Sequence, residues 1–181
     1  MRTPNIYFGN FCRTFLCSLL ACSRSGQVCL LDSASEATSD GTFHAALELP
    51  AYTGMFLTGG SDGNVQAWDS NTGSSAFTFA ANKHVNHLSM PAAAAKNASP
   101  LHTVCAVCTS GKAVKLLDLR IAAPVAHLSA SDSSVLQAAW SHCRPHLLAT
   151  AAADGTVFFW DARRSGLDAC VGQLDHEQQQ R

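Results

Sequence analysis

A nine-residue pattern occurs four times along this 181-residue chain, and each copy ends in an aspartate. Each copy also carries a valine four residues before that aspartate. The four copies are RSGQVCLLD (24–32), SDGNVQAWD (61–69), SGKAVKLLD (110–118) and ADGTVFFWD (153–161). The aspartates are therefore 37, 49 and 43 residues apart, with a mean spacing of 43. Repetition at such a period strongly limits the folds open to the chain, because it is typical of stacked, similar units.

Each copy has the features of a turn followed by the second strand of a β-hairpin. In the second copy, an apolar strand over 56–58 precedes Asp62-Gly63, a strong hairpin turn signal, and a strand over 64–68 follows. The fourth copy repeats this order with a strand over 148–150, the turn Asp154-Gly155 and a strand over 156–160. Further strands precede three of the hairpins, and we predict them over 44–49, 85–90 and 135–140. Units of about four strands each predict an all-β fold.

A period of about 40 to 45 residues ending in Trp-Asp is typical of the blades of a WD-repeat β-propeller. This resemblance implies a buried hydrogen-bonded set in each regular blade: an Asp in the turn, a Ser or Thr one strand earlier, and the Trp. The matching residues are Thr58, Asp62 and Trp68 in the second copy, and Thr150, Asp154 and Trp160 in the fourth. A buried Trp needs an acceptor for its N–H group. The first and third copies depart from the pattern at Ser25, Leu31, Gly111 and Leu117.

We predict that residues 15–170 form a partial propeller, with repeats ending near 32, 69, 118 and 161. Residues 1–14 are an N-terminal segment that need not be ordered, and residues 171–181 are a polar tail. About four blades are fewer than the seven common in this family, and closure of the ring removes free sheet edges. The chain is a fragment of a seven-bladed propeller, a four-bladed ring, or part of a larger closure, and we favour the fragment.

The first 22 residues allow two interpretations. They carry two arginines, no acidic residue and an apolar run over 15–21, as a short signal peptide does, and Leu19 to Cys22 resembles a lipoprotein cleavage box. However, LLACSRSG (19–26) aligns in repeat register with FLTGGSDG (56–63) and LATAAADG (148–155). We favour a blade strand, since cleavage would cut through a repeat. An exported, lipid-anchored propeller stays open as an alternative.

The cysteines and histidines do not predict a metal site or a cofactor. Cys105 and Cys108 form a C-x-x-C motif, but they fall in a predicted strand, where residues three apart point to opposite faces. We therefore predict that both pack in the core. The cluster of His142, Cys143 and His146 is predicted to lie on a surface turn.

No catalytic motif is present in the sequence, which has neither a nucleophile elbow nor a phosphate-binding glycine loop. We predict a binding protein and not an enzyme. The formal net charge is −1, and Arg163-Arg164 is the one adjacent basic pair, so direct binding to nucleic acid is not expected. No apolar segment approaches the ~20 residues of a membrane-spanning helix, so no membrane partner is expected either.

Several short segments narrow the resemblance further. They are TGMF (53–56), WDSNT (68–72), CAV (105–107), VKL (114–116), DLR (118–120) and LLATAAADGTVFFWDARRSG (147–166). Over residues 44–176, and more weakly over 19–32, the chain resembles the Cockayne syndrome group A family of WD-repeat proteins. The resemblance implies a nuclear, non-catalytic substrate receptor of a cullin-RING E3 ubiquitin ligase acting in transcription-coupled nucleotide excision repair. The implied partners are the damaged-DNA-binding adaptor of a cullin-4 type ligase, and repair or RNA polymerase components as substrates.

Receptors of this class carry an Asp-x-Arg box where the repeat strand ends, often in two successive blades. Here the resemblance assigns adaptor docking to Asp118 with Arg120 and to Asp161 with Arg163. An arginine just past a strand end lies at a propeller face, where its planar fork can pair bidentately with a partner's acceptors. The alternative is a generic WD-repeat interaction scaffold with an unrelated partner, in which these arginines are solvated surface residues.

Overall fold

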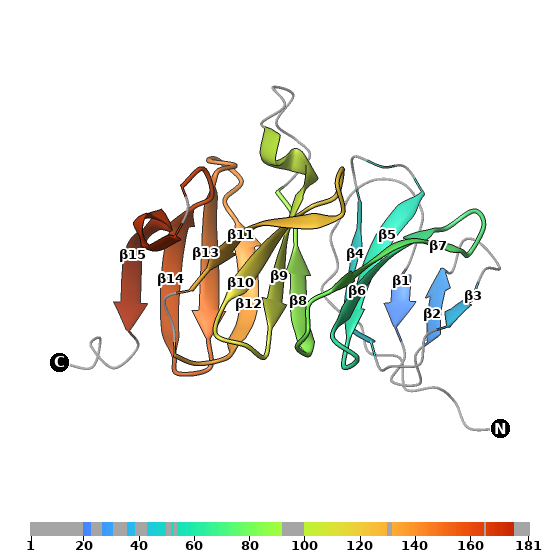
Figure 1. Cartoon of the computed structure of the whole chain (residues 1–181), viewed down its shortest axis with the longest axis horizontal. Helices are drawn as coiled ribbons and strands as arrows, with labels where there is room; N and C mark the ends of the chain where they lie inside the picture. Colours follow the sequence, from blue (N-terminus) through green and yellow to red (C-terminus); the bar gives the residue numbers. More distant parts are fainter. Residues whose placement is uncertain are drawn as a thin grey trace. The chain divides into compact units, whose positions relative to one another are not determined.

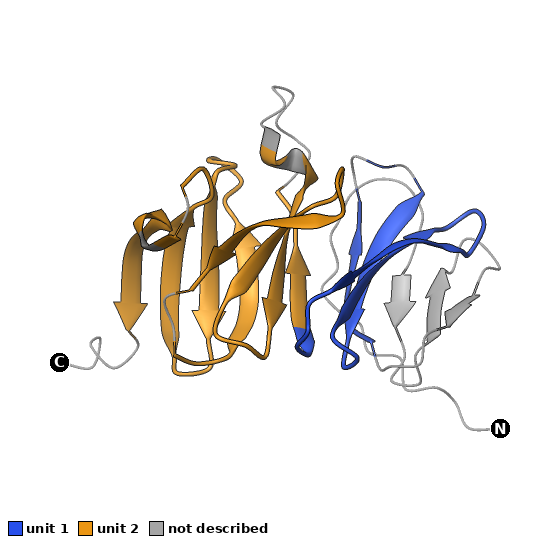
Figure 2. Cartoon of the chain, in the orientation of Figure 1, with its two compact units in different colours: residues 1–85 blue, residues 86–181 orange. Residues whose placement is uncertain are grey.

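The computed structural model describes residues 20–22, 27–30, 36–38, 43–49, 52, 54–91, 100–129, 132–164 and 166–175. Within these ranges the chain consists of β-strands and two short 3-10 helices (Figure 1). It divides into two compact units, unit 1 over residues 1–85 and unit 2 over residues 86–181 (Figure 2). No helix in the described part of the chain is long and apolar enough to span a membrane.

Unit 1 contains a short three-stranded sheet and a four-stranded antiparallel sheet. The strands of the first are β1 (Leu20–Cys22), β2 (Gln27–Leu30) and β3 (Glu36–Thr38). Those of the second are β4 (Phe43–Glu48), β5 (Met55–Gly60), β6 (Asn64–Asp69) and β7 (Ser75–Ala80). The β5–β6 turn forms at Asp62-Gly63, where Gly63 has a φ of +75°, a conformation that glycine adopts without steric cost.

Unit 2 contains two four-stranded antiparallel sheets, ordered β11-β10-β9-β8 and β12-β13-β14-β15, and β8 begins at the last residue of unit 1. The first comprises β8 (Val85–Ser89), β9 (Val104–Thr109), β10 (Val114–Asp118) and β11 (Ala123–Leu128), with the 3-10 helix η1 (Pro100–Thr103) before β9. The second comprises β12 (Val135–Trp140), β13 (Leu147–Ala152), β14 (Thr156–Asp161) and β15 (Cys170–Asp175), with η2 (Gly166–Ala169) before β15. Every strand predicted from the sequence has a counterpart in the structure. The predicted strands 44–49, 56–58, 64–68, 85–90, 135–140, 148–150 and 156–160 correspond to β4, β5, β6, β8, β12, β13 and β14.

The two sheets of unit 2 pack on each other through one apolar core. The β8–β11 sheet contributes Val104, Ala106, Cys108, Val114, Leu116 and Leu128. The β12–β15 sheet contributes a different set, which includes Trp140, Leu148, Phe158 and Trp160. Each Å² of apolar surface buried in this core stabilises unit 2 by about 25 cal/mol.

The opposite side of the β12–β15 sheet repeats the apolar surface that the β8–β11 sheet buries. The two sheets can be aligned by placing Asp118 on Asp161 and following the strand register. The core residues of the β8–β11 sheet then correspond to a second set of residues in the β12–β15 sheet. This set is Leu147, Ala149, Ala151, Val157, Phe159 and Leu174, and we call it the outer face. Phe159 is 37% exposed and Leu174 is 52% exposed, whereas their counterparts Leu116 and Leu128 are buried. A sheet face of blade composition that is covered in one repeat and open in the next is the pattern of a partial WD-repeat propeller.

Two details of the predicted organisation can be compared with the strands. Residues 20–22 form β1, as the repeat register predicts, while residues 1–19 and the Ala-rich run 92–99 lie outside the described residues. The prediction of a polar tail from residue 171 is wrong for 171–175. These residues belong to β15, which pairs with β14 and completes the sheet.

Candidate functional site

Among the described residues, three strands end in a repeat aspartate, and a similar turn follows each of them. In each turn the aspartate Oδ1 accepts the backbone N–H of the residue two positions later. The donors are Asn71 at 2.8 Å after Asp69, Arg120 at 3.0 Å after Asp118, and Arg163 at 3.1 Å after Asp161. We call residues 69–72, 118–121 and 161–164 the β6 turn, the β10 turn and the β14 turn.

A second hydrogen bond fixes each turn against the loop before the hairpin. The residue after the aspartate donates its backbone N–H to the carbonyl of the residue fifteen positions before the aspartate. The pairs are Ser70 to Gly54 at 2.7 Å, Leu119 to Thr103 at 3.0 Å, and Ala162 to His146 at 2.8 Å. Two corresponding hydrogen bonds therefore hold all three turns at the same positions. The turns differ in their side chains and in a third backbone bond, which runs from Gly73 to Asp69 after the β6 turn and from Arg164 to Asp161 in the β14 turn.

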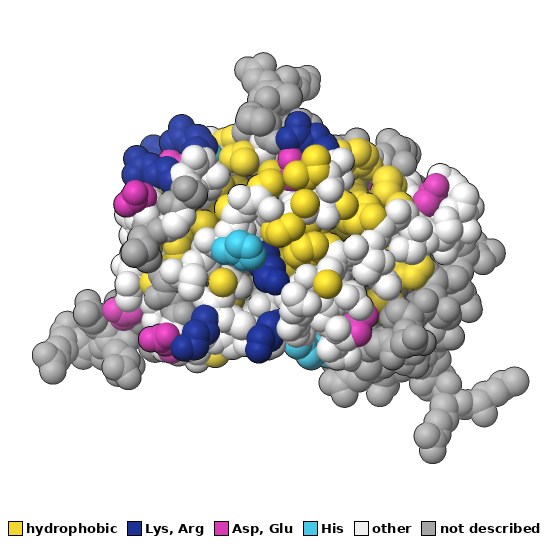
Figure 3. Space-filling model, viewed as in Figure 1, with side chains coloured by type: hydrophobic (Ala, Val, Ile, Leu, Met, Phe, Trp, Pro, Cys, Tyr) yellow, Lys and Arg dark blue, Asp and Glu magenta, His cyan; other side chains and the backbone are white. Residues whose placement is uncertain are grey.

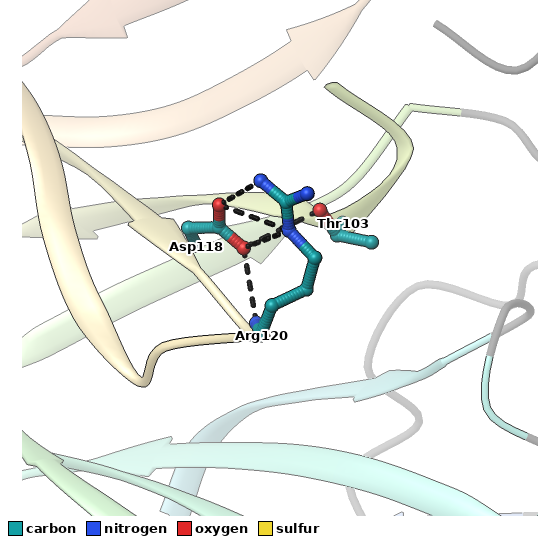
Figure 4. A network of polar contacts seen from close by, with 3 residues as sticks. All are labelled: Thr103, Asp118 and Arg120. Carbon is teal, nitrogen blue, oxygen red and sulfur yellow. Dashed lines mark hydrogen bonds and ion pairs between the residues drawn. The ribbon is translucent and has the colours of Figure 1, made fainter. Parts of the chain in front are cut away.

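In the β10 turn the arginine folds back over its own aspartate (Figure 4). Arg120 Nε lies 3.1 Å from Oδ1 of Asp118, and Nη2 lies 2.7 Å from Oδ2. Thr103 Oγ1 donates a hydrogen bond to Asp118 Oδ1 at 3.4 Å. Asp118 is buried, while the Arg120 side chain is 60% exposed. The hydrogen bond from Arg120 lowers the pKa of Asp118, so this carboxylate is ionised at neutral pH.

The β14 turn repeats this ion pair. Arg163 Nε lies 2.9 Å from Oδ1 of Asp161, and Nη2 lies 2.6 Å from Oδ2. Asp161 is buried and the Arg163 side chain is 62% exposed. The hydrogen bond from Arg163 lowers the pKa of Asp161 strongly, with a smaller contribution from the charge of His146. In return, Asp161 raises the pKa of Arg163.

The β6 turn carries no cation. Asn71 occupies the position of the two arginines, and Asp69 is only half-buried. Two of the three turns are therefore buried aspartate–exposed arginine pairs, at the positions that the Asp-x-Arg pattern selected.

The ion pairs change which part of each arginine can meet a partner. The sequence suggested that the guanidinium fork pairs with a partner's acceptors. In the structure the Nε–Nη2 edge of Arg120 and of Arg163 pairs with the chain's own aspartate, so the planar group turns its Nη1 side away from the carboxylate. The Nε–Nη2 edge of each arginine is therefore occupied within the chain itself.

The predicted buried set of Asp, Thr and Trp is a pair and not a triad. Trp68 Nε1 donates to Thr58 Oγ1 at 2.8 Å and Trp160 Nε1 donates to Thr150 Oγ1 at 2.9 Å, and these four residues are buried. The two turn aspartates are exposed, so the expectation that they are buried is wrong. Asp62 accepts the backbone N–H of Asn64, and Asp154 accepts that of Thr156. A side chain in a tight turn reaches the N–H two residues on, which keeps it at the turn and away from the strand interior.

The other polar candidates lie where no shared site forms. Cys105 and Cys108 are buried in β9, and burial raises the pKa of each thiol to about 12. His142 and Cys143 are exposed on the β12–β13 loop, with His146 half-buried beside them. The described residues contain no group of three or more potential metal ligands, and nothing among them points to an enzymatic activity.

Sequence reasoning missed the partners of the two boxes, above all Thr103 beside Asp118 and His146 beside Asp161. A signal for them was available, because each lies fifteen residues before its repeat aspartate, as Gly54 does before Asp69. The nine-residue pattern is too short to include that position.

The four-stranded sheets, the repeated turns and the Trp–Thr pairs define a WD-repeat protein. In agreement, residues 122–161 match the family model described as "WD domain, G-beta repeat". The chain is also similar to the WD repeat-containing protein ATCSA-1 of Arabidopsis thaliana, with 32% identity over 136 residues. That alignment covers 75% of this chain and 28% of the relative, so the chain matches little more than a quarter of the relative's length.

Proposed function

We propose that this chain is part of a nuclear, non-catalytic substrate receptor of a cullin-RING E3 ubiquitin ligase acting in transcription-coupled nucleotide excision repair. The observation that carries the proposal is the pair of buried aspartate–exposed arginine turns at the ends of β10 and β14, in two sheets that pack on each other. The resemblance of the sequence to the Cockayne syndrome group A family supports it. The letters CSA in the name of the relative point the same way.

In this proposal the arginines dock the damaged-DNA-binding adaptor of a cullin-4 type ligase, and repair or RNA polymerase components are the substrates. The buried carboxylate holds each guanidinium in a fixed orientation before the partner arrives. A pre-organised side chain loses less conformational freedom on binding, which is otherwise a cost of about 0.5 to 1.5 kcal/mol for each immobilised side chain. Arginine is also enriched among the residues that dominate protein interfaces.

A second candidate is a WD-repeat scaffold whose partner is unrelated to ubiquitin ligases. It is favoured by the completeness of the ion pairs within the chain. Asp118 and Asp161 are fully paired by Arg120 and Arg163 without any partner, so the turns need no docking role to explain their geometry.

One co-purification experiment distinguishes the two candidate functions. The tagged full chain and a double variant, Arg120→Ala with Arg163→Ala, are used to purify bound proteins from nuclear extract, with immunoblotting for the adaptor. We expect the wild-type chain to retain the adaptor and the double variant to lose it by at least about tenfold, the scale of two interface arginines. Asn71→Ala is the matched control, because Asn71 occupies the same position in the β6 turn and should leave adaptor recovery unchanged.

Circular dichroism of each variant shows whether the fold is retained. Equal recovery of the adaptor by the wild-type chain and the folded double variant would refute docking through these turns. Recovery of other proteins without the adaptor would favour the scaffold.

A further inference from the structure

The three equivalent turns differ in charge at three corresponding positions. The residue after the arginine position is Thr72, Ile121 or Arg164 in the β6, β10 and β14 turns. The residue fifteen positions before the aspartate is Gly54, Thr103 or His146, and the residue two before that is Tyr52, Leu101 or Arg144. At the first of these positions the β14 turn carries a basic residue, and at the other two the β12–β13 loop beside it does so. The corresponding residues at the other two turns are neutral.

These basic residues come from two segments that a hydrogen bond holds together. The backbone N–H of Ala162 donates to the carbonyl of His146, which places the β12–β13 loop beside the β14 turn. Arg164 Nε lies 4.0 Å from Asp161 Oδ2, so both arginines of the turn lie at the same carboxylate. The Arg164 side chain is 60% exposed, and Arg144 is also exposed.

The formal charge at the three sites increases along the chain. Around the β6 turn, residues 52–54 and 69–72 carry one aspartate and no cation among their described members, and around the β10 turn Arg120 balances Asp118. Residues 141–146 and 161–169 carry three arginines, against the two carboxylates Asp161 and Asp168. Because Arg163 already neutralises Asp161, the β14 turn and the β12–β13 loop together have a positive excess.

We propose that the β14 turn and the β12–β13 loop form a binding surface for an acidic segment of a partner protein. Arg164 contributes an exposed guanidinium group next to the paired Arg163, and Arg144 is exposed on the loop that the Ala162–His146 hydrogen bond joins to this turn. The β10 turn, in contrast, offers an apolar contact through Ile121, which is 63% exposed. The inference goes beyond the proposed function, since it requires only a run of Asp or Glu side chains and no component of a ubiquitin ligase.

An acidic polypeptide fits this surface better than a nucleic acid does. Nucleic-acid sites usually carry a basic stripe that follows the phosphate backbone. On the face drawn in Figure 3, the Lys and Arg side chains of the described residues stand in small separate groups, several of them beside carboxylates. A compact pair of guanidinium groups suits one or two carboxylates, which arginine recognises with directional hydrogen bonds.

The test measures the binding of fluorescein-labelled hexaglutamate to the full chain by fluorescence anisotropy. Hexalysine and a single-stranded hexathymidylate are the comparison probes. We expect hexaglutamate to bind and hexalysine not to bind, with a dissociation constant that rises with salt concentration. Arg164→Ile should weaken hexaglutamate binding about fivefold, because it places at this position the residue found in the equivalent β10 turn.

Lys112→Ala is the charge-matched control. Lys112 is an exposed cation paired with Asp132, away from the β14 turn in sequence, and its loss should leave the affinity unchanged. The proposal is overturned if Arg164→Ile leaves the affinity unchanged, if Lys112→Ala weakens it equally, or if hexathymidylate binds more tightly than hexaglutamate. The co-purification experiment measures binding of the adaptor itself through Arg120 and Arg163, so a negative result with hexaglutamate leaves that experiment standing.

Discussion

The hydrogen bond between Trp160 and Thr150 is expected to contribute measurably to the stability of unit 2. Both side chains are buried, so neither can bond to water in the folded protein. Thr150→Val keeps the shape of the side chain and replaces the hydroxyl with a methyl group. The Trp160 N–H then stays buried without its acceptor, at a cost of about 1 to 3 kcal/mol.

The chain contains a natural comparison for this substitution. In the β8–β11 sheet the positions that correspond to Thr150 and Trp160 are occupied by Val107 and Leu117, and both are buried. The repeat thus lacks both hydrogen-bonding groups at once. Replacing both partners leaves no unsatisfied donor, whereas removing one of them does.

A double-mutant cycle follows from this comparison. Thr150→Val, Trp160→Leu and the double variant are compared by urea unfolding of the full chain, monitored by far-ultraviolet circular dichroism. Trp160→Leu leaves a cavity and is destabilising by itself. The double variant should be less destabilised than the sum of the single variants by about 1 to 3 kcal/mol, because the Trp N–H is then absent.

Amide hydrogen exchange of β13 and β14 localises the effect. The single variant Thr150→Val should accelerate exchange in these strands and leave β5 and β6 of unit 1 unaffected. If Thr150→Val changes stability by less than about 0.5 kcal/mol, or if the two single effects add, the hydrogen bond carries no net stabilisation and the reasoning fails.

The remaining predictions concern the ion pairs and one close backbone approach. The pKa values of Asp118 and Asp161 are lower in the folded chain than the ordinary 3.8. The two ion pairs therefore stabilise the folded chain above pH 3.8, and this stabilisation is lost as the pH falls further. Thermal melts between about pH 5 and about pH 2 should show this loss, and Arg163→Ala should reduce the pH dependence; identical profiles would contradict it. A Cβ at Gly59 would lie 2.5 Å from Val85 Cγ1, so Gly59→Ala should destabilise by about 1 to 3 kcal/mol, and an unchanged melting temperature would disprove the close contact.

The strands could be predicted from the sequence because their signals are local. Asp62-Gly63 and Asp154-Gly155 are turn signals that fix where one strand ends and the next begins, and the repeat aspartates fix where the second strand ends. The exposed position of these two turn aspartates could not be predicted in this way. A turn that offers its own backbone N–H as a donor satisfies Asp62 and Asp154 locally, and the Trp–Thr pair needs no third member.

The site was only partly predictable. The Asp-x-Arg pattern located Asp118 with Arg120 and Asp161 with Arg163, but it did not show that each arginine pairs with its own aspartate. That result depends on the turn conformation, in which the backbone N–H of the arginine bonds the same carboxylate that its side chain pairs with. The contribution of His146 needed the fold as well, because its segment reaches the turn through a backbone hydrogen bond.

The regularity of a repeat and the presence of an aspartate–arginine pair after its strand are separate properties of this chain. The second repeat is regular, with Trp68 bonded to Thr58, yet its β6 turn has Asn71 and no cation. The third repeat lacks the Trp and its acceptor, yet Asp118 holds Arg120 in the same turn. The Trp–Thr pair lies between strands, whereas the aspartate acts through backbone groups of the turn after the strand. Substitutions in the Trp–Thr pair should therefore change blade stability without removing the ion pair, and substitutions at the arginines should remove the ion pair without breaking the Trp–Thr hydrogen bond.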